Sequence, residues 1–365
     1  MSQFLPRLDL QQRHLMFRIG RRLGGEKPLY EVAERRWEIA PAERLRLSPA
    51  VFLPGQFDKI RAFEPNTRLD IEKPRVFGGD FERPPVVAYR FRDAVLYQGA
   101  IFCRGRMRRI LPYAIAPPPS KDFPVLEFNE GGLAGTWLGL RYFGHWIKDD
   151  ATLSLLAGEY GEAVSPAPPV WHAGVHKEEH IPAYARFLDL PWRVAENVRF
   201  GTLVMFKDEE ITSHKAGRLK RLRERAKAKL GPYPAPKRIF IKRGVADRGA
   251  RRFNNESAVA EALVKEGFAV IDPTAMTVEE IAGAAYGAEL VVNMEGSHVN
   301  HAIYFARDGA SFLAVTPPER FNTPFKQWTE LLGMRYGFVV GDPDTEGFSA
   351  NIDDVRRTMD LFGKA

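Results

Sequence analysis

Between residues 237 and 315 the chain alternates regularly between short apolar segments and amphipathic ones. Such repeated strand–helix units with short connections favour a parallel sheet with helices on both faces, whose ligand lies at the carboxyl ends of the strands. Thr277 followed by Glu280 adds a capping box before one helix. In chain order, we expect a strand at 237–242, a helix at 256–266, a strand at 268–272, a helix at 278–286, a strand at 288–292, a helix at 299–306 and a strand at 311–315.

One strand end in this series has the chemistry of a phosphate site. After the strand at 288–292 the chain continues as Glu295-Gly296-Ser297 and then enters a helix. Free backbone N–H groups and the positive end of a helix converge at such a turn. Gly296 allows close approach of the backbone, and Ser297 can cap the helix or hydrogen-bond an oxygen. The sequence therefore predicts a phosphorylated ligand.

Composition limits the class of protein. A chain of 365 residues with 45% hydrophobic content is long enough for two domains with separate cores. No apolar run approaches the ~18–20 residues of a membrane span, and the N-terminus lacks the apolar core of a secretory signal. Cys103 is the single cysteine and cannot form an internal disulfide. We expect a soluble cytoplasmic protein.

The net charge of +7 is concentrated in one segment. Residues 215–229 carry eight basic residues and one acid, Glu224, while apolar residues recur there at helical spacing. Two interpretations remain open: a solvated helix face, or contact with an anionic partner such as a membrane surface, a nucleotide or a glycolipid phosphate. The first thirty residues form a second basic patch interleaved with apolar residues, which leaves an interfacial helix at the inner face of a membrane open as well.

The character of the chain changes several times before residue 237. Residues 41–125 have short alternating runs typical of strands, residues 136–156 have helical spacing, and 200–206 reads as a buried strand. The proline-rich stretch 231–236 cannot continue a helix and serves as a connector. The expected division is an N-terminal domain at 1–207, a basic helix and connector at 208–236, a C-terminal domain at 237–345, and a C-terminal helix at 346–365 that packs back on the N-terminal domain.

Short motifs follow one another in a characteristic order. Along the chain they are Tyr142-Phe143-Gly144-His145-Trp146, Asp149-Asp150, a strand ending in Arg243, the run RRFNNE at 251–256, Gly267-Phe268, Glu279-Glu280-Ile281, and Glu295-Gly296-Ser297 through His301 and Phe305. In order and spacing they resemble glycosyltransferase family 61 over residues 136–315. Two positions depart from the family pattern: Glu295 stands where the family has His, and Gly144 intrudes before His145.

The resemblance implies an α/β protein of GT-B architecture, with two Rossmann-like domains facing across a cleft. It makes 1–207 the acceptor-side domain and 237–345 the nucleotide-sugar-binding domain. It also implies an inverting glycosyltransferase that moves a hexose or pentose from a nucleotide-sugar donor to a glycan or glycolipid acceptor. Bacterial relatives indicate a role in capsule, lipopolysaccharide or other polysaccharide biosynthesis. The residues assigned to donor binding are Arg243, Arg251, Arg252, Asn255, Gly296, Ser297, His298 and His301. Two alternatives remain open: that Asn255 only starts a helix, and that the arginines are only solvated surface residues.

Inversion needs a base that takes the proton of the acceptor hydroxyl. His145 and Asp149 are four residues apart in a helical stretch, so the carboxylate can orient the imidazole. A buried core histidine beside Trp146 is the competing interpretation. Glu295 is the second candidate for the base or for a sugar hydroxyl contact.

No metal and no cofactor other than the nucleotide sugar is expected. His172, His176 and His180 are spaced four apart, but residues i and i+8 of a helix are separated by about 12 Å of rise. Asp342-Pro343-Asp344 imitates a metal-binding Asp-x-Asp, and its Pro and the preceding Gly341 favour a turn.

Two other classes of protein remain as alternatives. One is a non-catalytic module that binds nucleic acid or an acidic polymer through residues 215–229, although this segment lacks the interleaved aromatic residues of a single-strand platform. The other is an enzyme such as a nucleotide-sugar epimerase. An NAD-dependent reaction is disfavoured because no Gly-x-Gly-x-x-Gly follows the strand at 237–242.

Overall fold

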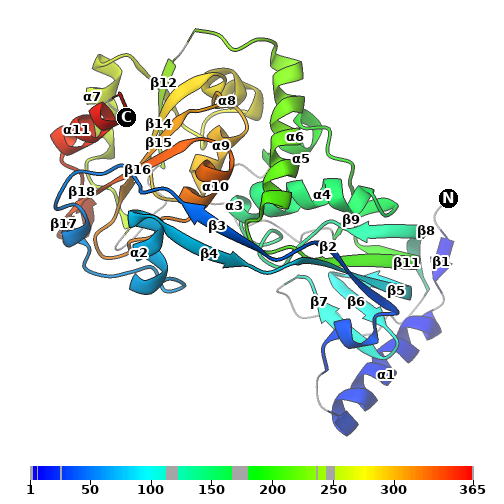
Figure 1. Ribbon diagram of the computed structural model, residues 1–365. Coiled ribbons are helices and arrows are strands. Elements are labelled where there is room, and N and C mark those ends of the chain that lie inside the picture. The colour runs from blue at the N-terminus through cyan, green and yellow to red at the C-terminus, as the bar shows by residue number, and fades with distance from the viewer. Residues whose placement is uncertain are drawn as a thin grey trace. The chain divides into compact units, whose positions relative to one another are not determined.

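The computed structural model describes residues 3–5, 7–24, 27–111, 122–166, 180–235, 237–243 and 251–363 (Figure 1). The chain divides into two compact units, each assembled from segments distant in sequence. The first comprises Met1–Ala42, Pro84–His172 and Asp189–Glu210, and the second comprises Glu43–Arg83, Ala173–Leu188 and Ile211–Ala365. No described helix has both the length and the apolar character that crossing a membrane requires.

In the described part of the second unit, a five-stranded parallel sheet has the Rossmann-like order β13-β12-β14-β15-β16. Its strands are fully or largely buried apolar runs, as expected for a sheet covered on both faces. The strands are β12 (Lys237–Ile241), β13 (Phe268–Ile271), β14 (Ala288–Met294), β15 (Ser311–Thr316) and β16 (Arg335–Val340), and the helices between or after them are α7 (Glu256–Lys265), α8 (Val278–Ala285), α9 (Asn300–Ile303), α10 (Phe325–Leu331) and α11 (Ile352–Gly363).

The strand order creates a crevice between β12 and β14. From β12 the chain passes to β13 on one side, and the next crossover brings it back to β14 on the other side. Neighbouring connections therefore leave in opposite directions at the carboxyl ends of β12 and β14, which is where doubly wound sheets bind ligands.

The alternation expected from the sequence is confirmed for this sheet. The capping box is also confirmed, because Thr277 Oγ1 accepts from the Glu280 N–H at 3.2 Å and Glu280 accepts from the Thr277 N–H at 2.7 Å. The expected helix at 299–306 is shorter than predicted. It consists of a 3₁₀ turn η5 (Ser297–Val299) and the single-turn α9.

In the first unit the described residues form a nine-stranded mixed sheet. Its parallel part, in the order β10-β9-β8-β11, adjoins antiparallel strands that begin with β5. Two hairpin turns, Gln98-Gly99 and Arg104-Gly105, have positive φ at both residues, which matches the twist of antiparallel strands. The strands are β1 (Gln3–Leu5), β2 (Arg35–Ala40), β5 (Val86–Tyr97), β6 (Ala100–Cys103), β7 (Arg106–Arg109), β8 (Phe123–Leu133), β9 (Glu162–Pro166), β10 (Arg193–Ala195) and β11 (Asn197–Lys207), and the helices are α1 (Arg7–Gly24), α3 (Phe143–His145) and α4 (Ala151–Gly158).

Segments before residue 237 also enter the second unit, so the units differ from the domains expected in chain order. Phe52 shows why, because its ring stacks on Phe338 of β16 at 4.8 Å between centroids. Residues 346–365 were expected against the N-terminal domain; in the structure Val355 and Phe362 of α11 join the core of the second unit. The further elements of this unit are α2 (Leu69–Phe77), β3 (Glu43–Leu47), β4 (Gly79–Arg83), α5 (His180–Phe187), α6 (Ser213–Leu230), β17 (Asp342–Asp344) and β18 (Gly347–Ser349).

The basic segment forms α6, as predicted, but its cations do not all face solvent. Lys215, Arg218 and Arg223 are buried. Arg223 donates to the carbonyls of Ile303 and Ala306, the second at 2.7 Å, where α9 ends. A solvated cationic face therefore does not describe these three residues. For Arg223 the reason is that orphan carbonyls at a helix end accept hydrogen bonds from its buried guanidinium.

Candidate active site

Arg243 lies immediately after β12, at the crevice of the parallel sheet. Its backbone N–H donates to Oε1 of Glu256 at 2.7 Å, and its Nη1 donates to the carbonyl of Glu295 at 3.0 Å. The first contact ties it to the start of α7 and the second to the turn after β14. The backbone of Arg243 is thus fixed on one side of the crevice and its buried side chain on the other.

Gly296 has a backbone that only glycine adopts readily, with φ of 151°. A Cβ at this position would also lie 1.6 Å from Nη1 of Arg243. The glycine therefore leaves space for the arginine, which agrees with the close approach that the sequence predicted at this turn.

Three described arginines converge beside this turn, and we call Arg243, Arg251 and Arg320 the arginine cluster. Glu295 links two of them, since its Oε2 lies 3.8 Å from Nη2 of Arg251 and 3.6 Å from Nη1 of Arg320. Arg320 also pairs with Oε1 of Glu64 at 2.9 Å.

The surroundings of Arg243, the most buried arginine of the cluster, disfavour its charged form. Burial, followed by repulsion from Arg251, lowers the pKa of Arg243 to about 9; Arg320 also lowers this pKa, and Glu295 and Glu256 oppose the shift. A site that makes an arginine this costly to ionise gains stability from an added anion. Planar guanidinium groups also match phosphate oxygens in a bidentate manner. The arrangement can therefore hold a diphosphate.

Arg320 was not identified from the sequence. It follows β15 in the stretch Thr316-Pro317-Pro318-Glu319-Arg320. The carboxyl ends of parallel strands meet at one edge of the sheet, so the position after β15 was the available signal.

Two of the sequence-predicted donor residues point to other contacts. Arg252 is exposed and pairs with Glu346 at 3.0 Å. Asn255 uses both ends of its amide on Ala350, donating to the carbonyl at 2.8 Å and accepting from the N–H at 2.9 Å. These contacts stabilise the loop before α11, and among the described residues neither side chain forms a hydrogen bond or ion pair with the arginine cluster.

The two predicted histidines of the α9 region are fully buried, His298 in η5 and His301 in α9. Tyr184 and Nδ1 of His301 share a hydrogen bond of 2.7 Å, and the His301 ring meets His180 edge-on at 5.1 Å between centroids. His301 is therefore a packing residue of the second unit. Ser297 stays half-buried, and its carbonyl accepts from the Asn300 side chain at 2.9 Å.

The first unit positions the predicted His145/Asp149 pair. Nδ1 of His145 lies 2.9 Å from Oδ2 of Asp149, and Lys148 Nζ lies 3.7 Å from the same oxygen. The side chain of Asp149 is 8% exposed and that of His145 is 35% exposed. A π-helical turn, η3 (Trp146–Asp150), carries Asp149, and such turns recur at functional sites.

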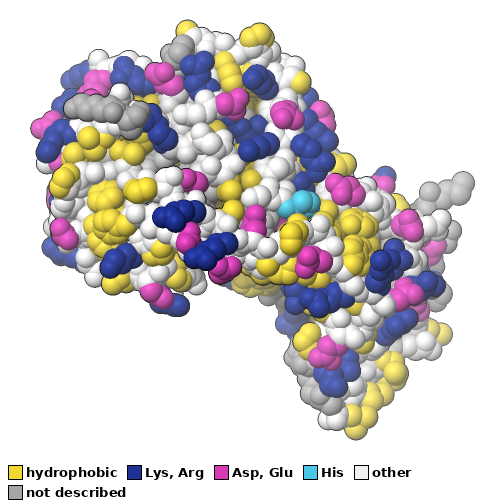
Figure 2. Space-filling model, in the orientation of Figure 1, with side chains coloured by type: hydrophobic (Ala, Val, Ile, Leu, Met, Phe, Trp, Pro, Cys, Tyr) yellow, Lys and Arg dark blue, Asp and Glu magenta, His cyan; other side chains and the backbone are white. Residues whose placement is uncertain are grey.

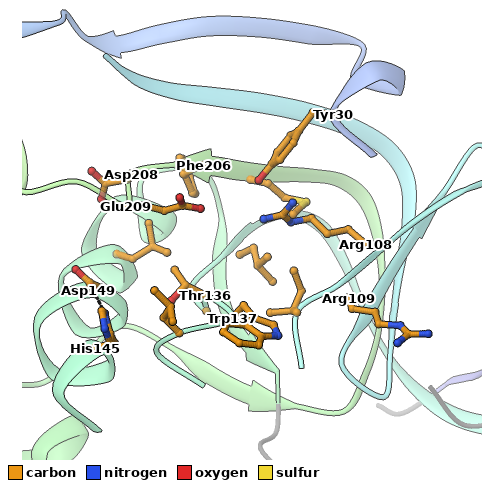
Figure 3. Close-up of a pocket in the computed structure, with 16 residues that line it drawn as sticks. Tyr30, Arg108, Arg109, Thr136, Trp137, His145, Asp149, Phe206, Asp208 and Glu209 are labelled. Carbon is orange, nitrogen blue, oxygen red and sulfur yellow. Dashed lines mark hydrogen bonds and ion pairs between the residues drawn. The ribbon is translucent and has the colours of Figure 1, made fainter. Parts of the chain in front are cut away.

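This pair lines a pocket of about 350 Å³ (Figure 3). Aromatic and acidic side chains surround the same space, and Asp208 among them is buried. The labelled residues include Tyr30, Arg108, Trp137, Asp208 and Glu209. Aromatic faces with carboxylate acceptors suit a hydroxyl-rich ligand.

The metal-like sequence patterns have other environments. His172 and His176 lie outside the described residues, and among the described ones no group of three or more His, Cys, Asp or Glu could hold a metal. Asp342 pairs with Lys59 at 3.1 Å, while Asp344 accepts from Asn254 at 3.0 Å. The predicted turn at 342–344 is wrong in detail, because these residues form β17, which pairs with β18.

The fold and the cluster thus define an α/β protein with three arginines gathered at the crevice of a Rossmann-like sheet. The family model Glycosyltransferase 61 matches residues 143–313, a segment that includes His145, Asp149, Arg243, Arg251 and Glu295. The resemblance expected from the sequence is thereby confirmed, and the family indicates glycosyl transfer from a nucleotide-sugar donor to a glycan acceptor in general terms.

Other comparisons add little. No curated protein matches the chain. Among solved structures, an alcohol dehydrogenase from Thermotoga maritima matches with 11% identity over 89% of this chain and 84% of that chain. Its TM-score of 0.20 is too low to bear on fold or activity.

Proposed function

We propose that the protein is an inverting glycosyltransferase of GT-B type that acts in bacterial capsule, lipopolysaccharide or related polysaccharide biosynthesis. The observation that carries the proposal is the arginine cluster beside Gly296 at the crevice between β12 and β14. Its position and charge fit the diphosphate of a hexose or pentose nucleotide donor.

Transfer forms a bond between the acceptor oxygen and the anomeric carbon of the donor and breaks the bond from that carbon to the β-phosphate oxygen. The departing nucleoside diphosphate gains negative charge as this bond breaks. Guanidinium groups that are already in place stabilise such charge without reorganising. The cluster therefore assists departure of the leaving group as well as binding.

His145 is the proposed base. Because the carboxylate of Asp149 accepts a hydrogen bond, Nδ1 of His145 carries the proton and Nε2 keeps a lone pair for the acceptor hydroxyl. The pocket that His145 lines is the proposed acceptor site. Glu295 remains the second candidate for the base, and its ion pairs with Arg251 and Arg320 favour a role in organising the cluster.

The proposed reaction uses no divalent metal and no cofactor beyond the nucleotide sugar, since the cluster supplies the positive charge at the diphosphate. A glycolipid acceptor, peripheral contact with an anionic membrane and a location at its inner face complete the proposal. Binding of nucleic acid or an acidic polymer is the second candidate. Burial of Lys215, Arg218 and Arg223 reduces the cationic face of α6 that it requires.

Calorimetry separates the two candidates. Wild-type protein is titrated with a panel of nucleoside diphosphates and nucleotide sugars, and separately with oligonucleotides over a range of salt concentrations. The glycosyltransferase proposal expects saturable binding of at least one nucleotide, lost in Arg243→Gln. Salt-sensitive oligonucleotide binding that persists in Arg243→Gln, with no nucleotide bound, would favour the polymer-binding protein.

A further inference from the structure

The N-terminal helix α1 has two apolar faces, and within the described part of the chain one of them is left exposed. Leu10 is buried in a core cluster of the first unit, and Phe17 packs against it. On other sides of the helix, large apolar side chains remain exposed. Figure 2 shows apolar and cationic side chains together on the surface. They are Leu8 at 60%, Leu15 at 55%, Met16 at 56%, Ile19 at 41% and Leu23 at 85% exposure.

These residues lie on one side of the helix, where Leu15, Met16, Ile19 and Leu23 are continuous and the exposed Gln12 separates Leu8 from them. Leu8, Leu15, Ile19 and Leu23 are separated by seven, four and four residues, so they project from nearly the same side, and Met16 widens this side. We call these five residues the apolar stripe. Soluble proteins expose single apolar residues often, but a contiguous stripe marks a contact surface.

Contacts between α1 and the rest of the first unit determine which face of the helix is exposed. Arg13 donates to the carbonyl of Asp93 at 2.8 Å and pairs with its carboxylate at 2.6 Å. Together with Leu10 and Phe17, this contact docks α1 through the face away from the stripe. The stripe is therefore presented by a docked helix.

Cations accompany the stripe, and acids do not. Arg18 and Arg22 are exposed on α1, and Asp9, the one acid within residues 7–24, pairs with Arg13 at 2.8 Å. The β6–β7 hairpin adds Arg104, which is exposed in the turn, and Arg106, which is half-buried at the start of β7. This turn lies beside α1, since a Cβ on Gly105 would be 3.6 Å from Cβ of Met16.

We propose that α1 is a membrane-docking helix whose apolar stripe enters the interface of an anionic bilayer while its arginines contact lipid phosphates. This inference deepens the membrane contact included in the proposed function. A second copy of the chain would bring the same cations to the stripe, whereas an anionic lipid surface supplies both apolar depth and opposite charge. Helices with an apolar face and flanking basic residues lie in such interfaces.

Vesicle flotation tests this docking with the full-length protein. Wild type should float with phosphatidylcholine vesicles that contain phosphatidylglycerol and should bind poorly to phosphatidylcholine alone. Arg18→Gln/Arg22→Gln should lower the partition coefficient roughly 25-fold, since each arginine near the surface contributes a factor of about five. Leu15→Gln/Ile19→Gln should lower it at least about 10-fold.

Val264→Gln is the matched control, because Val264 is 51% exposed on α7 of the second unit and should leave vesicle binding unchanged. Equal flotation of all variants, or equal binding to both kinds of vesicle, would overturn the proposal. So would a dimer in analytical ultracentrifugation that Leu15→Gln/Ile19→Gln converts to monomers. Nucleotide titration of the same variants distinguishes the two proposals. We expect the α1 variants to lose flotation while they still bind nucleotide. If wild type does not float, the docking proposal fails and the transferase proposal is unaffected.

Discussion

Arg243 occupies the space in which a side chain at Gly296 would begin. A Cβ there would lie 1.6 Å from Nη1 of Arg243 and 3.1 Å from Nη2 of Arg251. The two arginines therefore depend on the glycine, because only the absence of a side chain at residue 296 leaves room for their guanidinium groups beside the turn.

Gly296→Ala should accordingly displace the guanidinium of Arg243 and weaken nucleoside diphosphate binding by about 1–3 kcal/mol, the range for losing a charged hydrogen bond. Calorimetry measures the affinity, and circular dichroism checks that the fold is retained. Gly309→Ala is the control, since it also adds a side chain at a positive φ, here 74°, while nothing lies within 4 Å of the added Cβ. An equal loss in both variants would contradict the steric explanation.

Arg320→Ala should also weaken binding of the diphosphate by about 1–3 kcal/mol, because it removes one cation of the cluster and leaves Glu295 with fewer partners. Arg357→Ala removes an exposed arginine of α11 and should leave affinity unchanged. If nucleotide affinity survives Arg320→Ala, Arg320 serves only to hold Glu64 and Glu295.

The pKa of about 9 at Arg243 predicts how affinity depends on pH. Below this pKa the guanidinium is charged and binds the diphosphate, so affinity should fall as pH rises through about 9. A bound anion favours the charged form and raises this pKa, so binding near pH 9 should take up a proton. Titrations in buffers of different ionisation enthalpy measure that uptake, and Arg243→Gln should abolish it. Uptake that remains in the variant would assign the titration to another group.

The same shift has an opposite sign for stability. An arginine whose pKa is lower in the folded protein than in the unfolded chain releases its proton first in the folded state. The unfolded chain then binds more protons from about pH 9 up to the higher pKa that arginine has when unfolded, so this group favours folding as pH rises through that window. Ligand affinity and the contribution of Arg243 to stability thus change in opposite directions above pH 9.

His145→Ala should slow transfer by about 10²–10⁴-fold, the usual contribution of general base catalysis, with little change in donor affinity. Asp149→Asn should slow transfer as well. The carboxylate of Asp149 contacts Nδ1 of His145, and a neutral amide in its place would no longer stabilise the positively charged imidazole. Steady-state rates and nucleotide titrations separate the two effects. Full activity of His145→Ala together with an inactive Glu295→Gln would move the base to Glu295.

The parallel sheet of the second unit could be predicted because its signals are local. Each of its strands is a short apolar run, and the Thr277/Glu280 capping box marks a helix start within four residues. Short connections then leave few topologies. Arg243 and Gly296 were identified for the same reason, since each lies two residues beyond the last residue of an apolar strand.

The first unit could not be predicted in this way. β8 and β11 pair in parallel between residues such as Phe128 and Phe200, which are far apart in the chain. A pattern of period two indicates a strand but not its partner. Sequence patterns likewise assign cations to solvent, whereas the burial of Arg223 depends on carbonyls that α9 brings to it.

The last prediction concerns metal. The arginine cluster beside Gly296 can neutralise the diphosphate as a divalent ion does in other transferases, so turnover should survive EDTA. The competing assignment gives Asp342 and Asp344 to magnesium or manganese, which is usually held by a few carboxylates and the substrate phosphates. Their oxygens already contact Lys59 and Asn254. Activity is therefore measured in chelator, again with added manganese, and in Asp342→Asn/Asp344→Asn. Activity that EDTA removes and manganese restores, with an inactive double variant, would establish the metal-dependent mechanism instead.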